Sequence, residues 1–246
     1  MKAVLKSILL LFICFITACN NDGNKPVSNK CDSINVSKSF VERIDSNGLI
    51  VLKPSFSRID LVCGTEPSKD DKSVILFAEA AFTGKTLDSF AHSNIAGDHV
   101  SNGKRYKGYR CERNTGAFIY QKGTWNFLYK DYSKDLDEAA NNGGAAFAQE
   151  MIIYNGKLVK TEREDSNKNI FRALCNRDSD LYVIESAKKI SFEDFKKKLI
   201  DYNISNAIYL DMGEGWNYAW YRDGNDIIEL HPKVHNYCTN WITFYK

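Results

Sequence analysis

The chemistry of this chain is concentrated in residues 206–220, where an apolar run ends on a carboxylate. Asp211 closes this run and is followed by a Met-Gly-Glu-Gly turn and a cluster of aromatic residues. A strand that delivers an acid beside flexible glycines and flat rings suits a site that binds and cleaves sugars. Asp and Gly also dominate ordinary turns, so a plain turn at Asp211 is the alternative for this stretch taken alone.

Other acids could act together with Asp211, since sugar transfer usually needs two carboxylates. The candidates are Glu79, Asp98, Glu150 and Glu214. Asp98 and His99 follow Gly97, and such a pair can act as a base, as metal ligands or as a ligand-orienting pair. A polar loop explains the same residues equally well. The basic segment 101–113, with interleaved tyrosines, would suit a phosphate or an acidic sugar, and an exposed strand explains it as well.

Metal and cofactor motifs are weak in this sequence. His231 and His235 have the spacing of two zinc ligands on a helix, but Pro232 and Val234 argue against a regular helix there. A calcium ion could bind among the carboxylate oxygens, although no spaced ligand loop is present. We therefore expect no metal and no cofactor. The sequence also lacks a complete P-loop and a GxSxG elbow, which argues against a nucleotide-binding loop and a serine hydrolase of that type.

The elements that must position these residues are short strands and a few helices. Strands are predicted at 49–52, 59–62, 74–78, 117–120, 125–129, 151–154, 157–160 and 207–210. Asn155-Gly156 is typical of a type I′ hairpin turn. Helices are predicted at 85–91, at 133–140 with Ser133 as the cap, and at 191–202 with Ser191 as the cap. We expect an α+β fold with a mixed, mainly antiparallel sheet and a few helices.

The N-terminus has the pattern of a bacterial lipoprotein signal peptide at residues 1–18. Lys2 and Lys6 precede an apolar run that is too short to span a bilayer, and Ile-Thr-Ala-Cys then forms a cleavage box. Cys19 would carry the lipid anchor; an ordinary signal peptide with an incidental cysteine is the alternative. Residues 19–37 would form a flexible tether, and residues 38–246 a single domain. This pattern places the protein in the cell envelope, attached to a membrane and periplasmic or surface-exposed.

Charge argues against one class of partner, and the cysteine spacing argues against CxxC motifs. Without the two lysines of the leader, basic and acidic residues are equal in number, which argues against a nucleic-acid partner. Five cysteines remain after the leader and Cys19, none in a CxxC pair. One or two disulfides could form in an exported protein, and Cys175 lies in a run that we expect to be buried.

Several segments between residues 94 and 219, taken in order, resemble the phosphodiester glycosidase domain family. The clearest is a Phe-x-x-Phe helix followed by Asn-Ala-Ile-Tyr-Leu-Asp, within 191–211. The other matching segments are 94–97, 106–109, 114–127, 149–157 and 171–173. The resemblance implies that family's fold, a glycan or glycosyl-phosphate substrate, and a pocket that contains Asp211. The substrate-binding residues that it suggests are Asn94, Gly97, His99, Glu150, Arg172, Gly213 and Trp216.

The sequence departs from the family pattern at the ionisable positions. The family's Asp-Gly-Gly-Gly-Ser is Asp-Met-Gly-Glu-Gly at 211–215, so a serine is lost and Glu214 is gained. Asp98 and His99 stand where many relatives have aromatics. We expect an envelope lipoprotein that hydrolyses a glycosyl phosphodiester or a glycosidic bond, with Arg172 stabilising a phosphoryl or carboxylate oxygen. The alternative is a non-catalytic carbohydrate-binding lipoprotein that retains the pocket.

Overall fold

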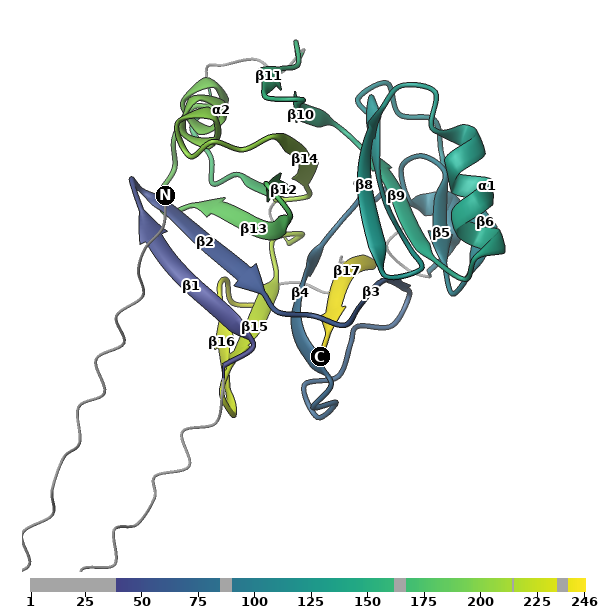
Figure 1. The fold of residues 1–246 in the computed structure, drawn as a ribbon, viewed down its shortest axis with the longest axis horizontal. Helices are drawn as coiled ribbons and strands as arrows, with labels where there is room; N and C mark the ends of the chain where they lie inside the picture. Colours follow the sequence, from purple (N-terminus) through teal and green to yellow (C-terminus); the bar gives the residue numbers. More distant parts are fainter. Residues whose placement is uncertain (1–38, 85–89, 162–166, 214, 234–238) are drawn as a thin grey trace, which may run out of the picture. The chain divides into compact units, whose positions relative to one another are not determined.

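The computed structural model describes residues 39–84, 90–161, 167–213, 215–233 and 239–246. All of them belong to the unit Val36–Lys246, one of the two units into which the chain divides. The described residues form three antiparallel β-sheets with two α-helices and one short 3-10 helix, η1 (His92–Asn94) (Figure 1). The fold is therefore β-rich, and the expected α+β class is wrong.

The largest sheet has seven strands, and Asp211 follows directly after one of them. Its order is β1 (Val41–Ser46), β2 (Leu49–Pro54), β13 (Asp180–Ser186), β12 (Arg172–Arg177), β14 (Asn206–Leu210), β10 (Met151–Tyr154) and β11 (Lys157–Leu158). In the register, Arg172 lies opposite Glu185 on β13 and opposite Leu210 on β14. Asp211 comes directly after Leu210, so β12 and β14 place it beside the strand that carries Arg172.

Two five-stranded sheets complete the fold. One has the order β16 (Asp226–Glu229), β15 (Ala219–Asp223), β4 (Val74–Glu79), β17 (Asn240–Tyr245) and β3 (Arg58–Cys63). The other has the order β6 (Lys104–Tyr106), β5 (His99–Ser101), β9 (Ala145–Gln149), β7 (Gly116–Gln121) and β8 (Thr124–Tyr129). The strand β17 lies between β4 and β3 and pairs with both, although it is far from both in the sequence.

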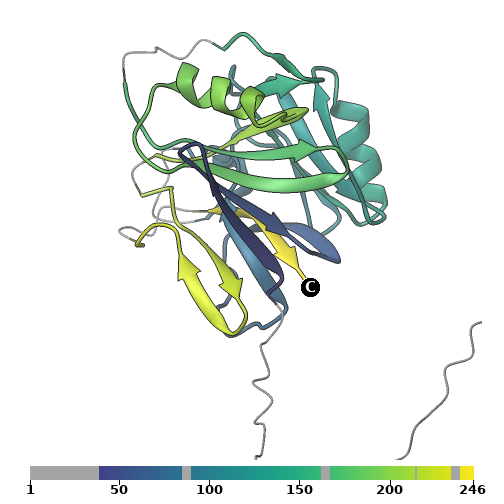
Figure 2. The same cartoon turned by 60° about the vertical axis from the view of Figure 1, so that its left-hand side comes forward.

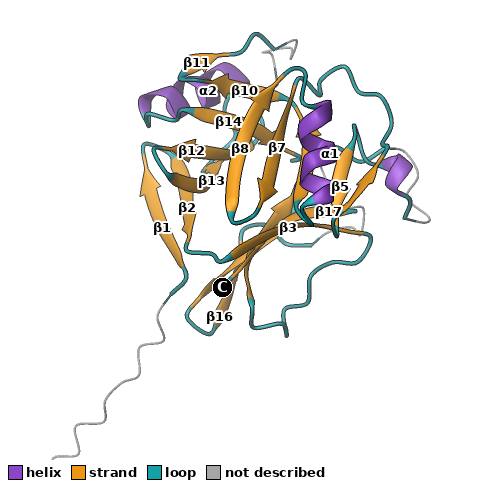
Figure 3. Ribbon diagram, turned by 45° about the vertical axis from the view of Figure 1, so that its right-hand side comes forward, coloured by secondary structure: helices purple, strands orange, loops and turns teal. Residues whose placement is uncertain are grey.

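Each α-helix covers one sheet. Helix α2 (Phe192–Asp201) lies over the large sheet (Figure 2). Its buried Phe192, Phe195 and Leu199 belong to one hydrophobic cluster with residues of that sheet. The hydroxyl of Ser191 accepts a hydrogen bond from the Asp194 amide at 3.0 Å, which confirms the predicted cap. Helix α1 (Ser133–Asn141) packs on the sheet of β5, β7 and β9 (Figure 3).

The sequence patterns predicted the hairpin turns and the buried face of α2 correctly. They did not predict the strands that contain many polar residues. Both predicted hairpins form, as β7–β8 and β10–β11. The predicted cap of α1 is wrong, because the N-cap residue is Tyr132 and makes no side-chain cap bond. The predicted helix at 85–91 falls largely outside the described residues. The fold class was misjudged because strands such as β1, β13, β15 and β16 mix charged and apolar residues and show no simple pattern.

The interior is apolar and extends over all three sheets. Buried side chains of the large sheet and of both five-stranded sheets share one hydrophobic cluster, which includes Leu76, Phe118, Leu174 and Leu210. Cys175 is buried, as predicted, and it is a free thiol like Cys63 and Cys111. Among the described residues, we find no helix with the length and hydropathy of a membrane span.

Candidate functional site

The ends of four strands meet at the backbone of Ala80 and Ala81. The Ala80 carbonyl accepts hydrogen bonds from the Asp211 amide at 3.1 Å and from Gln149 Nε2 at 3.4 Å. The Asn240 side chain bonds Ala81 twice, accepting from its amide at 2.8 Å and donating to its carbonyl at 3.0 Å. Strands β4, β9, β14 and β17 come from all three sheets, so this junction fixes where Asp211 stands.

Asp211 is held in a tight turn at this junction. Its Oδ1 accepts a hydrogen bond from the Gly213 amide at 3.2 Å, and the Gly213 carbonyl accepts one from the Trp216 amide at 2.8 Å. Burial raises the pKa of Tyr109 to about 12, and the charge of Asp211 adds only a small part of this shift.

Tyr109 lines a cleft of about 760 Å³ that also contains two carboxylates. The lining residues are Phe82, Thr83, Tyr109, Cys111, Glu112, Arg113, Thr115, Glu150, Lys160 and Thr161. Glu150 is buried, and its backbone is anchored on both sides: its amide donates to Gln149 Oε1 at 2.9 Å, and its carbonyl accepts from the Tyr209 amide at 2.8 Å. The cleft thus combines two acids, two aromatic rings and the two cations Arg113 and Lys160.

Arg172 lies at the centre of a buried ion network. Its Nε and Nη2 contact Glu185 Oε2 at 2.8 and 2.6 Å, and Nη2 also donates to the Asn217 carbonyl at 3.0 Å. His231 Nε2 lies 2.6 Å from the other carboxylate oxygen, Glu185 Oε1. Since Asn217 follows the Asp211–Trp216 turn directly, Arg172 ties that turn to β12 and β13.

The charge state of Glu185 follows from this network. Burial alone would raise its pKa, but the charge of Arg172 and the hydrogen bonds from His231 and Arg172 outweigh burial and hold the pKa of Glu185 below its ordinary value. The carboxylate is therefore ionised at neutral pH. The Nη1 atom of Arg172 is buried and has no hydrogen-bond partner in the part of the chain that the structure describes.

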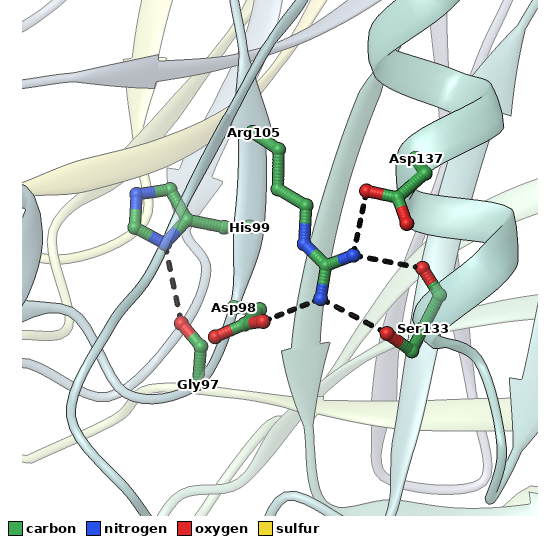
Figure 4. A network of polar contacts seen from close by, with 6 residues as sticks. All are labelled: Gly97, Asp98, His99, Arg105, Ser133 and Asp137. Carbon is green, nitrogen blue, oxygen red and sulfur yellow. Dashed lines mark hydrogen bonds and ion pairs between the residues drawn. The ribbon is translucent and has the colours of Figure 1, made fainter.

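Asp98 points toward helix α1 and away from His99. In Figure 4 its carboxylate meets Arg105 Nη2 at 2.6 Å, and the same guanidinium reaches Asp137 at 2.7 Å and the hydroxyl and carbonyl of Ser133. The His99 ring turns the other way, to the Gly97 carbonyl at 3.2 Å. Successive residues of an extended chain point to opposite sides, so Asp98 and His99 do not form a working pair.

His99 and Glu79 are buried and are not among the residues that line the cleft. Burial lowers the pKa of His99 to about 4, and its Nε2 lies 2.9 Å from Nδ1 of His92. The Glu79 carboxylate contacts the Thr83 hydroxyl and the Thr239 amide, both at 3.4 Å. Glu79 therefore touches the lining of the cleft through Thr83.

Asn94 and Gly97 support the site through the backbone. Gly97 has φ +75°, and a Cβ there would stand 2.1 Å from Asn114 Nδ2, so glycine is required. Its amide donates to the Tyr109 carbonyl at 2.8 Å, which holds the aromatic wall of the cleft. Asn94 is buried, and its carbonyl accepts from the Gly84 amide at 2.7 Å.

The predicted site residues thus fall into separate groups. Glu150 lines the cleft, and its carbonyl is bonded to Tyr209 on the strand that ends before Asp211. Asp211, Gly213 and Trp216 are joined within one turn, which Arg172 reaches through the Asn217 carbonyl. The predicted residues Cys19 and Glu214, and also His235, lie outside the described residues. The cleft residues Tyr109 and Arg113 belong to the segment 101–113, which the sequence indicated as suited to a phosphate or an acidic sugar. Sequence reasoning missed Glu185 and the role of His231. An isolated acid in the apolar run Tyr-Val-Ile-Glu was the available signal for Glu185, because a buried carboxylate needs a cation.

Comparisons with known proteins identify the fold. No model of a known protein family matches the sequence, and no curated protein matches it. The structure is similar to the catalytic domain of zebrafish N-acetylglucosamine-1-phosphodiester alpha-N-acetylglucosaminidase, auto-inhibited by its pro-peptide, with a TM-score of 0.56 and 12% identity over 84% of this chain and 82% of that one. A hypothetical protein from Synechocystis aligns with a TM-score of 0.51 and 10% identity, over 84% of this chain and 61% of that one. The chain therefore has a phosphodiester-glycosidase-like fold.

Proposed function

We propose that this chain is an envelope lipoprotein that hydrolyses a glycosyl phosphodiester or a glycosidic bond of a glycan. One observation carries the proposal: Glu150 lines the cleft, and its carbonyl accepts a hydrogen bond at 2.8 Å from the Tyr209 amide on β14, the strand that ends directly before Asp211. In this proposal the two acids serve one cleft, as most sugar-cleaving sites require. The similarity of the fold to a glycosidase catalytic domain supports the same reaction class.

The cleft offers a distinct task for each of its groups. One carboxyl group, of Asp211 or Glu150, protonates the leaving oxygen, while the other acts as base or nucleophile. The rings of Phe82 and Tyr109 give flat apolar faces on which a sugar can stack. Arg113 and Lys160 supply positive charge for a phosphoryl group.

Arg172 takes a positioning role in this proposal instead of the substrate contact expected from the sequence. Its guanidinium is buried, and two of its three nitrogens are engaged by Glu185 and the Asn217 carbonyl. It therefore fixes the turn that carries Asp211 and leaves the phosphoryl group to the cations of the cleft.

Hydrolysis assays on an N-acetylglucosamine-1-phosphodiester and on aryl glycosides test the proposal. The purified protein should turn over at least one of them, and Asp211→Asn and Glu150→Gln should each reduce kcat by about 100-fold or more, because each removes a group that exchanges protons in the transition state. Asp137→Asn, an exposed acid on α1, is the matched control and should keep wild-type rates. Rates unaffected by both cleft variants would refute the assignment.

The binding alternative gives a different result in the same experiment. A non-catalytic carbohydrate-binding lipoprotein would show no turnover of any substrate but would bind glycans in a way that Asp211→Asn weakens. The envelope location is tested separately by metabolic labelling with palmitate, which Cys19→Ser should abolish if Cys19 carries the lipid.

A further inference from the structure

A second cluster of chemically reactive side chains lies apart from the cleft. Cys63 ends β3, His92 begins the 3-10 helix η1, and His99 begins β5. Their ligand atoms, one sulfur and two imidazole nitrogens, all lie within 4.8 Å of one another. The two nearest nitrogens, Nδ1 of His92 and Nε2 of His99, are 2.9 Å apart.

The ring orientation is set by contacts outside the cluster. Nδ1 of His99 lies 3.2 Å from the Gly97 carbonyl, so a proton on Nδ1 is held there and the Nε2 lone pair faces His92. Metal-bound histidines commonly donate their second ring nitrogen to a carbonyl in this manner. His92 stacks on the ring of Tyr106, which keeps its imidazole in place.

The sulfur of Cys63 is partly sheltered from solvent. Cys63 is half-buried, and its Sγ lies 4.0 Å from the Leu61 carbonyl. A bound divalent metal ion would displace the thiol proton to solvent and leave a metal–thiolate bond.

We propose that Cys63, His92 and His99 bind a zinc-like divalent transition-metal ion. Thiolate sulfur and neutral imidazole nitrogen are the ligands that Zn²⁺ takes, whereas Ca²⁺ and Mg²⁺ require oxygen ligands. Three protein ligands leave a fourth position of a tetrahedral ion for water. The ion would connect β3 of one five-stranded sheet to β5 of the other, so its role is to tie two sheets together.

Metal titration of the full-length protein in detergent tests this site. After reduction and chelator treatment, Co²⁺ alone should bind with thiolate-to-cobalt charge-transfer absorption, release a proton, and be displaced by Zn²⁺. Cys63→Ser should abolish the charge-transfer band, and His92→Gln should weaken Zn²⁺ binding by about tenfold or more. Cys111→Ser, another half-buried free thiol, is the matched control and should keep both.

Thermal unfolding separates site loss from misfolding. Zn²⁺ should raise the unfolding temperature of the wild type and of Cys111→Ser, and should leave that of a folded Cys63→Ser unchanged, because only the folded site binds the ion. The absence of a stoichiometric thiolate band in the wild type would overturn the proposal. Persistence of the band in Cys63→Ser, or its loss in Cys111→Ser, would assign it to other cysteines and overturn it equally.

Discussion

Arg172 and Arg105 both gather carboxylates, but they do so in opposite environments. The side chains of Arg172 and Glu185 are 0% and 4% exposed, whereas Arg105, Asp98 and Asp137 are 26%, 32% and 61% exposed. The shortest nitrogen–oxygen distance is nevertheless 2.6 Å in both networks. Distance alone therefore says nothing about what each network contributes to stability.

Solvent access accounts for the difference. The exposed ions of the Arg105 network interact through water and are screened by salt, so each pair contributes at most about 1 kcal/mol. The buried ions of the Arg172 network have lost their hydration and depend on each other, so removing one leaves an uncompensated charge. The buried network also holds the Asn217 carbonyl, which connects it to the turn of Asp211.

The largest effect is expected from Arg172→Met. Deleting the guanidinium strands the Glu185 carboxylate in the interior and should lower the free energy of unfolding by about 3–5 kcal/mol. Urea denaturation followed by circular dichroism measures this loss. A change below 1 kcal/mol would mean that the two networks contribute equally to stability, and it would contradict the role given to burial.

The pH dependence of the free energy of unfolding should also reveal the contribution of the buried network. Because the folded state lowers the pKa of Glu185 below the ordinary 4.5, its contribution is fully present above that value and is lost as pH falls through the lowered pKa. Urea midpoints measured from neutral pH downward should therefore fall in acid. The fall should be smaller in Glu185→Gln, which has no carboxyl group to protonate. An identical acid slope in the two proteins would contradict this account.

His231→Phe should have an intermediate effect. It removes one hydrogen bond to the buried carboxylate while Arg172 remains, so a loss of about 1.5 kcal/mol is expected. Thermal or urea unfolding at neutral pH measures it. A loss as large as that of Arg172→Met would make the histidine, and not the arginine, the main partner of Glu185.

Arg105→Met should have the smallest effect, below about 1 kcal/mol. The difference from wild type should shrink further at high salt, because screening weakens exposed ion pairs. Unfolding measured at low and high sodium chloride checks both statements. An effect that is large or insensitive to salt would show that exposure does not govern these two networks.

Local features of the fold could be predicted from the sequence, and long-range ones could not. The Asn155-Gly156 hairpin and the Ser191 cap depend on a few neighbouring residues, and both formed as expected. The order of strands in the sheets depends on pairings such as β2 with β13, for which adjacent residues carry no signal. The sequence therefore indicated an α+β class, because the signals of the helices are local and those of many strands are not.

The residues of the candidate site also divide into those that local sequence predicts and those that long-range contacts bring together. Asp211 and Gly213 were found because the acid and its turn are contiguous, and the structure joins them by a hydrogen bond. Glu185 reaches the site from β13 and Tyr109 from the connection between β6 and β7, so their part depends on tertiary packing. The approach of Cys63 to the two histidines likewise arises only when β3 meets β5.

The central place of β17 has a consequence for how the chain folds. Its neighbours β3 and β4 are paired through it, and Asn240 at its start holds Ala81 at the junction of the three sheets. Until β17 inserts, that sheet is split and the Asp211 junction has lost one of its supports. Pairings between residues so distant in sequence form slowly, so we expect acquisition of the site to be a late kinetic step in refolding.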